Sequence, residues 1–306
     1  MIAAGLLEGV VPVAPTPFHD DGALDPDGMR RVLDCMVAQG NDGICVLANY
    51  SEQFLLSDEE RALIARLSLE HVAGRVPVVV TCSHFSTRVA AARARDAAAL
   101  GAAMVMLMPP YHGTGLRAGA AEILDHFAAV AEAGLPIMVQ DSPLSGVELS
   151  APFLVELARK VPLVTHFKIE VPQSAAKLRA LIALGGDAVP GPLDGEEGIT
   201  LLADLDAGAR GTMTSAMIPD LVRAVVDGHH AGRREAAMAA YARILPAINH
   251  ENRQCGLRAA KIAFREGGVI RSEAVRHPLT PVHPDTRVQL LELLRPLDPV
   301  ALRWGR

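Results

Sequence analysis

Eight short apolar runs, each followed by a longer segment with helical periodicity, dominate the first three quarters of this chain. The runs cover residues 10–16, 43–49, 76–83, 102–108, 136–141, 163–170, 187–192 and 211–215. Each run is almost continuously apolar, which is typical of strands buried on both faces of a parallel sheet. Eight strand–helix units in this order favour a (β/α)8 TIM barrel, an α/β fold, over a doubly wound sheet.

The helical segments and the remaining sequence predict how the chain is divided. Helix-like stretches cover residues 26–39, 58–72, 87–100, 118–133, 151–160, 172–184, 195–207 and 219–228. Ser57 and Glu60 have the spacing of a capping box that opens the second of them. We predict a (β/α)8 catalytic barrel over residues 1–231 and an extension of additional C-terminal helices, residues 232–306, packed on the barrel.

Charge, cysteine usage and hydropathy exclude several classes of protein. The formal net charge is -6 and no basic cluster is present, which argues against a nucleic-acid partner. The four cysteines are scattered without metal-ligand spacing, so we expect no metal site and a reducing, cytoplasmic location. No apolar stretch reaches the roughly 18–20 residues of a membrane helix, and residues 1–18 lack the basic start of a signal peptide.

The ends of the predicted strands carry many small polar groups. In a TIM barrel the chemistry takes place where strands end and the following loops begin. We therefore expect the site to be lined by a set of strand-end residues, namely Asn49, Tyr50, Ser51, His84, Tyr111, Gln140, Lys168, Glu170 and Gly191.

Lys168 is the most informative member of this set. The chain has only four lysines, and Lys168 alone ends an apolar run, residues 161–167. Burial lowers the pKa of a lysine, and the free amine attacks a ketone to form a Schiff base. The alternative is an ammonium group that reaches solvent or pairs with Glu170. Position alone leaves both open, although residues i and i+2 of a strand share a face, which brings Glu170 to the same side.

Four segments resemble the dihydrodipicolinate synthase / N-acetylneuraminate lyase family of Schiff-base aldolases and dehydratases. Residues 9–18 are similar to its first strand and residues 56–61 to the start of its second helix. Residues 109–111 are similar to its fourth loop, and Phe167-Lys168 to its lysine strand. The resemblance covers nearly the whole chain and implies a TIM barrel whose Lys168 forms the Schiff base.

Two departures from the family pattern narrow the expected activity. The family usually has Gly-Thr-Thr-Gly-Glu after strand two, where this chain has Ala48-Asn49-Tyr50-Ser51-Glu52. After strand five it usually has Tyr-Asn-x-Pro with a proton-carrying tyrosine, and this chain has Gln140 at the tyrosine position. An amide does no acid–base work at neutral pH, so we expect Gln140 only to line the site.

The altered segments resemble a dehydratase branch of the family, in residues 44–53, 138–141, 167–170 and 248–254. This implies a small-molecule 2-keto-3-deoxy acid as substrate, 2-keto-3-deoxy-L-arabonate, dehydrated to 2,5-dioxopentanoate in pentose (arabinose) catabolism. From their positions we expect Glu170 to act as general acid and base, the alternative being that it only tunes Lys168 by pairing. We expect Asn49, Tyr50 and Ser51 as ligands of carboxylate or hydroxyl groups, and His84 and Tyr111 as polar contacts. The resemblance also implies a cytoplasmic homotetramer with no metal or organic cofactor, because the imine is the electron sink.

Two other functions stay open from the sequence. A pyruvate-dependent aldolase of the same family is one, and the missing strand-five tyrosine argues against it. A non-catalytic barrel that binds sugar acids is the other, and the combination of Lys168 with Glu170 argues against that. The products formed from the keto acid distinguish all three.

Overall fold

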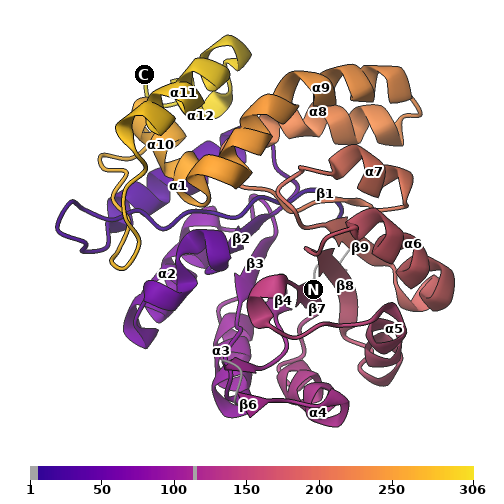
Figure 1. Ribbon diagram of the computed structural model, residues 1–306. Helices are drawn as coiled ribbons and strands as arrows, with labels where there is room; N and C mark the ends of the chain where they lie inside the picture. Colours follow the sequence, from indigo (N-terminus) through magenta and orange to yellow (C-terminus); the bar gives the residue numbers. More distant parts are fainter. Residues whose placement is uncertain (1–5, 113–115) are drawn as a thin grey trace.

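The computed structural model describes residues 6–112 and 116–306, and its centre is a closed barrel of parallel strands (Figure 1). The sheet order is β1-β10-β9-β8-β7-β4-β3-β2, and a bridge from Val13 to Cys45 joins its two edges, while one from Val13 to Ser215 extends the pairing of β1 with β10. The predicted (β/α)8 TIM barrel is therefore confirmed. The strands are β1 (Gly9–Val10), β2 (Ile44–Val46), β3 (Val78–Thr81), β4 (Met104–Leu107), β7 (Ile137–Asp141), β8 (Val164–Ile169), β9 (Gly191–Asp194) and β10 (Gly211–Thr212).

A helix follows each strand and packs outside the barrel. Ser57 and Glu60 form the predicted capping box at the start of the second helix. A short hairpin, β5 (Tyr111–His112) with β6 (Leu116–Arg117), is inserted between β4 and the fourth helix. The eight helices are α1 (Pro26–Ala38), α2 (Asp58–Val72), α3 (Thr87–Ala99), α4 (Ala120–Ala131), α5 (Ala151–Lys160), α6 (Ser174–Gly185), α7 (Leu201–Asp206) and α8 (Pro219–His230).

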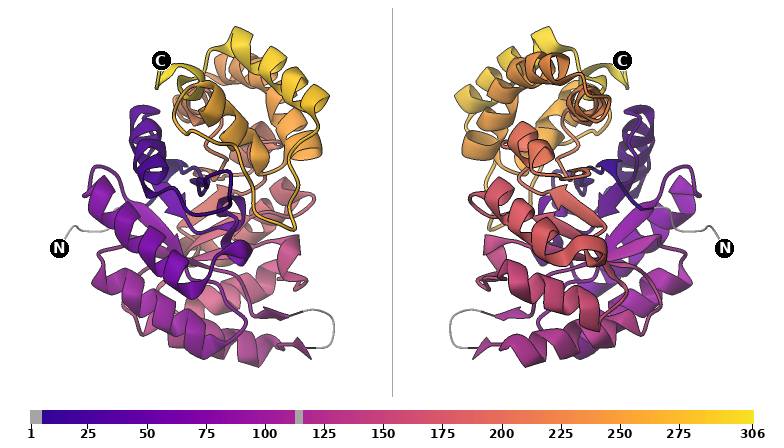
Figure 2. Two further views of the ribbon diagram at one scale, coloured as in Figure 1. Left: turned by 90° about the vertical axis from the view of Figure 1, so that its left-hand side faces the viewer. Right: turned by 90° about the vertical axis from the view of Figure 1, so that its right-hand side faces the viewer.

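Additional helices follow the eighth strand–helix unit, as predicted. They lie together at one end of the molecule in Figure 2, and the first of them packs along α8. They are α9 (Arg234–His250), a single π-helical segment η5 (Glu251–Cys255), α10 (Arg258–Glu266), α11 (Pro284–Leu294), η6 (Arg295–Leu297) and α12 (Val300–Arg303). The placement of a boundary at residue 231 stays a prediction.

The apolar core has two layers. The inner layer fills the barrel with side chains that point inward from the strands, including Val13, Met104, Met106 and Met138. The outer layer lies between the strands and their helices. Successive side chains of β4 alternate between the two layers. Met104 and Met106 point into the barrel, while Val105 and Leu107 point toward the helices, so the methionines of this strand serve packing.

The seventh strand differs from its predicted position. Residues 187–192 were expected to form it, but Gly186–Ala188 form a 3-10 turn and β9 covers Gly191–Asp194. Glycine and proline have low strand propensity, so the sequence of β9 gives a weak local signal. Its pairing with β8 and β10 in the closed barrel fixes its position instead.

No helix in the described parts of the chain is long and apolar enough to cross a membrane.

Candidate active site

Lys168 and Glu170 form an ion pair at the carboxyl end of β8. The distance from Lys168 Nζ to Glu170 Oε2 is 3.0 Å, and the two side chains are 3% and 14% exposed. Lys168 belongs to the strand and Glu170 follows it directly, so the period of two directs both side chains to one side. The predicted proximity of these two residues is confirmed.

Gln140 fixes the position of Glu170 from the neighbouring strand. Gln140 on β7 lies opposite Lys168 in the strand register and is fully buried. Its Nε2 donates a hydrogen bond to Glu170 Oε2 at 2.9 Å. The adjacent Asp141 instead pairs with Lys177 of α6 at 2.5 Å. Gln140 therefore lines the site by orienting the carboxyl group, which an amide can do without changing its protonation state.

The charge state of Lys168 matches the second of the two alternatives that the sequence left open, an ammonium group paired with Glu170. Burial alone lowers the pKa of this amine, as predicted. The negative charges of Glu170 and Glu197 and the hydrogen bond to Glu170 outweigh burial, so the pKa of Lys168 is raised above its usual value. The unliganded protein therefore holds an ammonium group here. Nucleophilic attack requires that its proton first move to a neighbouring carboxyl group.

Glu197 is a second carboxyl group near Lys168, and the sequence analysis missed it. It lies in the loop between β9 and α7, with its backbone in the left-handed region (φ 53°). Its carbonyl oxygen accepts a hydrogen bond from Thr214 Oγ1 at 3.1 Å, and the residue is only 6% exposed. Burial raises the pKa of Glu197 well above its usual value, opposed by Lys168 and reinforced by Glu170 and Glu251. Glu197 is thus a second buried carboxyl group that interacts electrostatically with the amine.

Glu251 and Tyr50 complete a group of titratable side chains at this end of the barrel. Glu251 is buried at the start of the π-helical segment, and burial raises its pKa to about 8 against the effect of a Ser215 hydrogen bond. Tyr50 packs against the inner core. Its pKa is raised by burial and by the charges of Glu197, Glu251 and Glu170. π-Helical turns are frequent at functional sites, and this one overlaps residues 248–254, a segment that resembles the dehydratase branch.

In the loop after β2, the side chains of Asn49 and Ser51 differ in how many of their hydrogen-bonding groups are already used. Asn49 Oδ1 accepts a hydrogen bond from Gln53 Nε2 at 2.7 Å, whereas its Nδ2 is buried with no partner among the described residues. Ser51 Oγ donates to the Ala14 carbonyl at 2.6 Å and accepts from the Ala48 amide at 3.1 Å. Asn49 therefore keeps a free donor for a ligand, while the Ser51 hydroxyl is used within the loop.

His84 and Tyr111 lie among groups of the outer helices. His84 Nδ1 accepts a hydrogen bond from the Ser86 amide at 2.9 Å, and burial together with Arg93 lowers the pKa of its ring. The Tyr111 ring stacks edge-on against Phe54 at 5.7 Å between centroids. No interaction in the described residues links either side chain to Lys168, and their roles as substrate contacts stay predictions.

Gly191 does not end its strand, which corrects the expectation on which its choice rested. It is the first residue of β9 and lies opposite His166, two residues before Lys168 along β8. A Cβ atom at this position would lie 2.5 Å from His166 Cδ2. Gly191 thus permits a close approach between two strands on the amino-terminal side of Lys168.

The described residues hold no group of three or more histidine, cysteine, aspartate or glutamate side chains arranged to bind a metal ion. The functional groups are instead one amine and several carboxyl groups at the carboxyl ends of parallel strands. This combination on a (β/α)8 barrel defines a lyase of the lysine-dependent class.

Comparison with known proteins gives the family. The model of the dihydrodipicolinate synthetase family matches residues 6–296, and the chain belongs to this family. It is 56% identical over 298 residues to the L-2-keto-3-deoxyarabonate dehydratase of Azospirillum brasilense, covering 97% of this chain and 96% of that protein. It is 33% identical over 285 residues to a 4-hydroxy-tetrahydrodipicolinate synthase of Xanthomonas axonopodis pv. citri, with 90% of each chain covered.

A solved structure agrees with this assignment. The dihydrodipicolinate synthase of Rhodopseudomonas palustris superposes with a TM-score of 0.85 at 28% identity, covering 94% of this chain and 97% of that one.

Proposed function

We propose that this protein is a hydro-lyase that converts 2-keto-3-deoxy-L-arabonate to 2,5-dioxopentanoate through an imine on Lys168. The 56% identity to an enzyme named for this substrate supports the substrate. The observation that carries the chemistry is the ion pair of Lys168 with Glu170, whose carboxylate accepts a hydrogen bond from Gln140.

The reaction begins with proton transfer from Lys168 to Glu170 across their 3.0 Å contact. The free amine attacks the C2 ketone, and loss of water gives a protonated imine. The imine withdraws electrons from C3, so a carboxylate removes a C3 proton and leaves an enamine. The enamine electrons then expel the C4 hydroxyl, which leaves as water after receiving a proton.

The second half of the reaction restores the enzyme. The conjugated imine loses a C5 proton, and protons return to C3 and C4 as the C5 enol becomes an aldehyde. Hydrolysis of the imine releases 2,5-dioxopentanoate and the amine. The net change is the loss of one water molecule. Glu170 is suited to the C3 proton because it already exchanges a proton with Lys168. Glu197, a buried carboxyl group whose pKa is raised, is suited to donate to the departing hydroxyl.

Unpartnered buried polar atoms support binding of a polyhydroxylated acid. Asn49 Nδ2, Gln140 Oε1 and Glu251 Oε1 are buried without hydrogen-bond partners among the described residues. Buried polar atoms are nearly always paired in folded proteins, so atoms left free at one end of a barrel are suited to substrate oxygens. We assign Asn49 and Tyr50 to the substrate carboxylate or hydroxyl groups, and Ser51 to the shape of their loop.

We propose in addition that the enzyme acts in the cytoplasm as a homotetramer, which the family resemblance implies. Mass photometry at nanomolar concentration tests the assembly, and a monomer with full activity would contradict it.

The function is tested by product analysis. Purified enzyme is incubated with 2-keto-3-deoxy-L-arabonate, and 2,5-dioxopentanoate is detected by coupling to a semialdehyde dehydrogenase. We expect stoichiometric aldehyde without pyruvate. Pyruvate with glycolaldehyde as the main products would instead identify an aldolase, and no conversion would favour a binding protein.

A further inference from the structure

The loop that carries Asn49 and Tyr50 has an unusual backbone. Two 3-10 turns, η1 (Asn49–Ser51) and η2 (Gln53–Leu55), are joined by Glu52 in the left-handed region at φ 57° and ψ 36°. A residue other than glycine adopts this conformation at a cost, and it persists where surrounding contacts fix it. The contacts that fix Glu52 come from the C-terminal helices.

Glu52 is the acceptor at the centre of a buried polar cluster. Its Oε1 accepts a short hydrogen bond from Lys261 Nζ of α10, and both side chains are fully buried. Its Oε2 accepts from the Arg276 amide at 3.0 Å. Lys261 Nζ also donates to the Ala274 carbonyl at 2.8 Å and lies 4.3 Å from the centre of the Phe18 ring. Every one of these contacts joins residues far apart in sequence or in different elements.

The segment that supplies Arg276 is residues 271–283, here called the strap, which connects α10 to α11 and extends toward α2 in Figure 1. The Arg276 guanidinium binds both carboxylate oxygens of Glu60 on α2 at 2.6 and 2.5 Å. It also donates to the Leu55 carbonyl at 3.0 Å, at the end of η2. The strap therefore holds the loop at Glu52 and again at Leu55.

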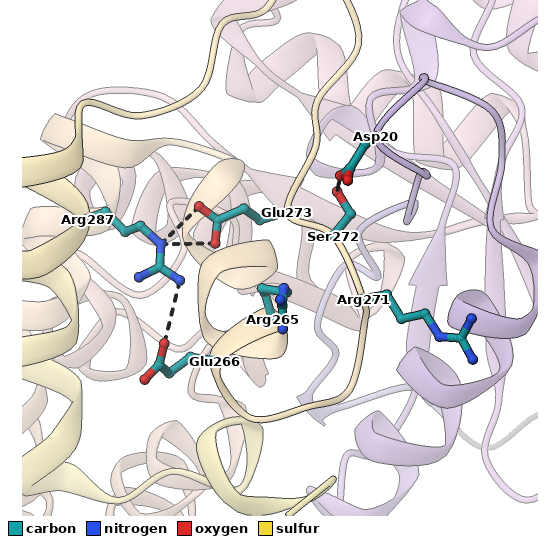
Figure 3. Close-up of a pocket in the computed structure, with 7 residues that line it drawn as sticks. All are labelled: Asp20, Arg265, Glu266, Arg271, Ser272, Glu273 and Arg287. Atoms are coloured by element: carbon teal, nitrogen blue, oxygen red, sulfur yellow. Dashed lines mark hydrogen bonds and ion pairs between the residues drawn. The ribbon is translucent and has the colours of Figure 1, made fainter.

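The strap is itself anchored where it leaves α10. A pocket of about 470 Å³ lies at this point. Among its lining side chains in Figure 3, Ser272 reaches Asp20 and Glu273 pairs with Arg287 of α11. The contact from Ser272 Oγ to Asp20 is 2.5 Å, and that from Arg287 Nε to Glu273 is 2.9 Å. A strap fixed at its base transmits the position of α10 to the loop.

We propose that Glu52 and Lys261 are positioning residues through which the C-terminal helices hold Asn49 and Tyr50 in place for the substrate. The expected effect on KM rests on the proposed function, whereas the expected effect on the geometry of the loop does not. A buried ion pair is costly to form and is often replaced by apolar side chains without loss of stability. The fully buried pair beneath this loop is therefore better explained by its effect on the conformation of the loop than by a contribution to stability.

The test separates geometry from stability with the double variant Glu52→Gln/Lys261→Met. It removes both charges, keeps an acceptor for the Arg276 amide and leaves no lone buried charge, so we expect a wild-type urea midpoint. Amide hydrogen exchange of residues 49–55 should be faster. KM for 2-keto-3-deoxy-L-arabonate should rise roughly tenfold, the effect of one lost hydrogen bond, with little change in kcat.

The matched control is Lys160→Met, which breaks an exposed pair with Glu156 at 2.6 Å and should change neither readout. Wild-type exchange of residues 49–55 in the double variant would overturn the proposal whatever the substrate. Faster exchange with an unchanged KM would overturn its kinetic part. A wild-type enzyme that does not convert the pentonate would contradict the proposed function. The exchange measurement would still decide whether Glu52 and Lys261 position the loop. If the double variant does not fold, Glu52→Asp, with the carboxylate drawn back by one carbon, gives the same two readouts.

Discussion

At the scale of single residues, the proposed chemistry depends most on Glu170. Its carboxyl group is within 3.0 Å of the amine and is oriented by Gln140, so it can take a proton from Lys168 and then from C3. Glu170→Gln keeps the shape and a hydrogen-bond partner for Gln140. We expect the variant to form the imine but to lose turnover by about 10²–10⁴-fold, the usual contribution of a general acid–base group.

Borohydride trapping with mass spectrometry, together with C3 hydrogen exchange in heavy water, measures the two steps separately. Lys168→Ala is the control and should trap no substrate. If Glu170→Gln also traps none, Glu170 instead sets the charge of Lys168. Wild-type turnover in the variant would exclude both roles.

The sequence identified the position of Lys168 and the proximity of Glu170, but not the charge state of the amine. A strand-end lysine in an apolar run indicates burial, and burial alone lowers a lysine pKa. The opposing effect comes from two carboxyl groups, and one of them, Glu197, is brought close only by the closed barrel. A local pattern contains no information about that contact, so the sequence left the direction of the pKa shift open.

At the scale of elements, the displaced β9 explains why Glu197 was missed. With a strand expected at 187–192, residues 195–207 were assigned to the next helix, and Glu197 fell within it. The structure begins α7 at Leu201, so Glu197 lies in a loop at the carboxyl end of the strand. The other strands were predicted because they are rich in β-branched and apolar residues. The Gly-Pro-Leu-Asp sequence of β9 lacks that signal.

The contact between β8 and β9 gives a prediction for Gly191→Ala. The added methyl group would lie 2.5 Å from His166 Cδ2. The ring cannot turn freely, because its Nε2 accepts from the Leu7 amide at 3.1 Å and its Nδ1 contacts Thr165 Oγ1 at 2.8 Å. We expect the free energy of unfolding to fall by about 1–3 kcal/mol, as for other overpacked cores. Urea denaturation measures this loss.

The same substitution in a His166→Ala background should cost less, because the clash is gone. An equal cost in both backgrounds would show that the ring is not the cause. KM should stay at the wild-type value, since Gly191 lies on the amino-terminal side of Lys168. A raised KM at unchanged stability would restore the substrate-binding role that the sequence suggested.

At the scale of the whole molecule, the buried carboxyl groups link stability to pH. Burial raises the pKa of Asp194 and that of Glu251 to about 8 each, with Asp204 adding to the shift of Asp194. From the ordinary carboxyl range up to about pH 8 the native state therefore binds more protons than the unfolded chain. Because the native state binds these extra protons, the free energy of unfolding falls as pH rises through this range.

Buried histidines oppose this effect only under acidic conditions. Burial lowers the pKa of His126 and that of His166 to about 4, from an ordinary value of 6.5. Their contribution therefore increases as pH rises from about 4 to 6.5 and is complete above that. Between pH 6.5 and 8 the carboxyl effect remains, and stability should decline with rising pH.

Glu251→Gln tests this link, because the amide cannot ionise. In urea denaturation between pH 6.5 and 8, we expect the decline to be less steep than in the wild type by up to about 1.4 kcal/mol per pH unit, the contribution of one proton. Glu235→Gln, at an exposed position in α9, is the matched control and should keep the wild-type slope. If Glu251→Gln also kept that slope, Glu251 would be ionised in the native protein at neutral pH. Its negative charge would then raise the pKa of both Glu197 and Tyr50, and Glu197 would remain the proton donor of the proposed mechanism.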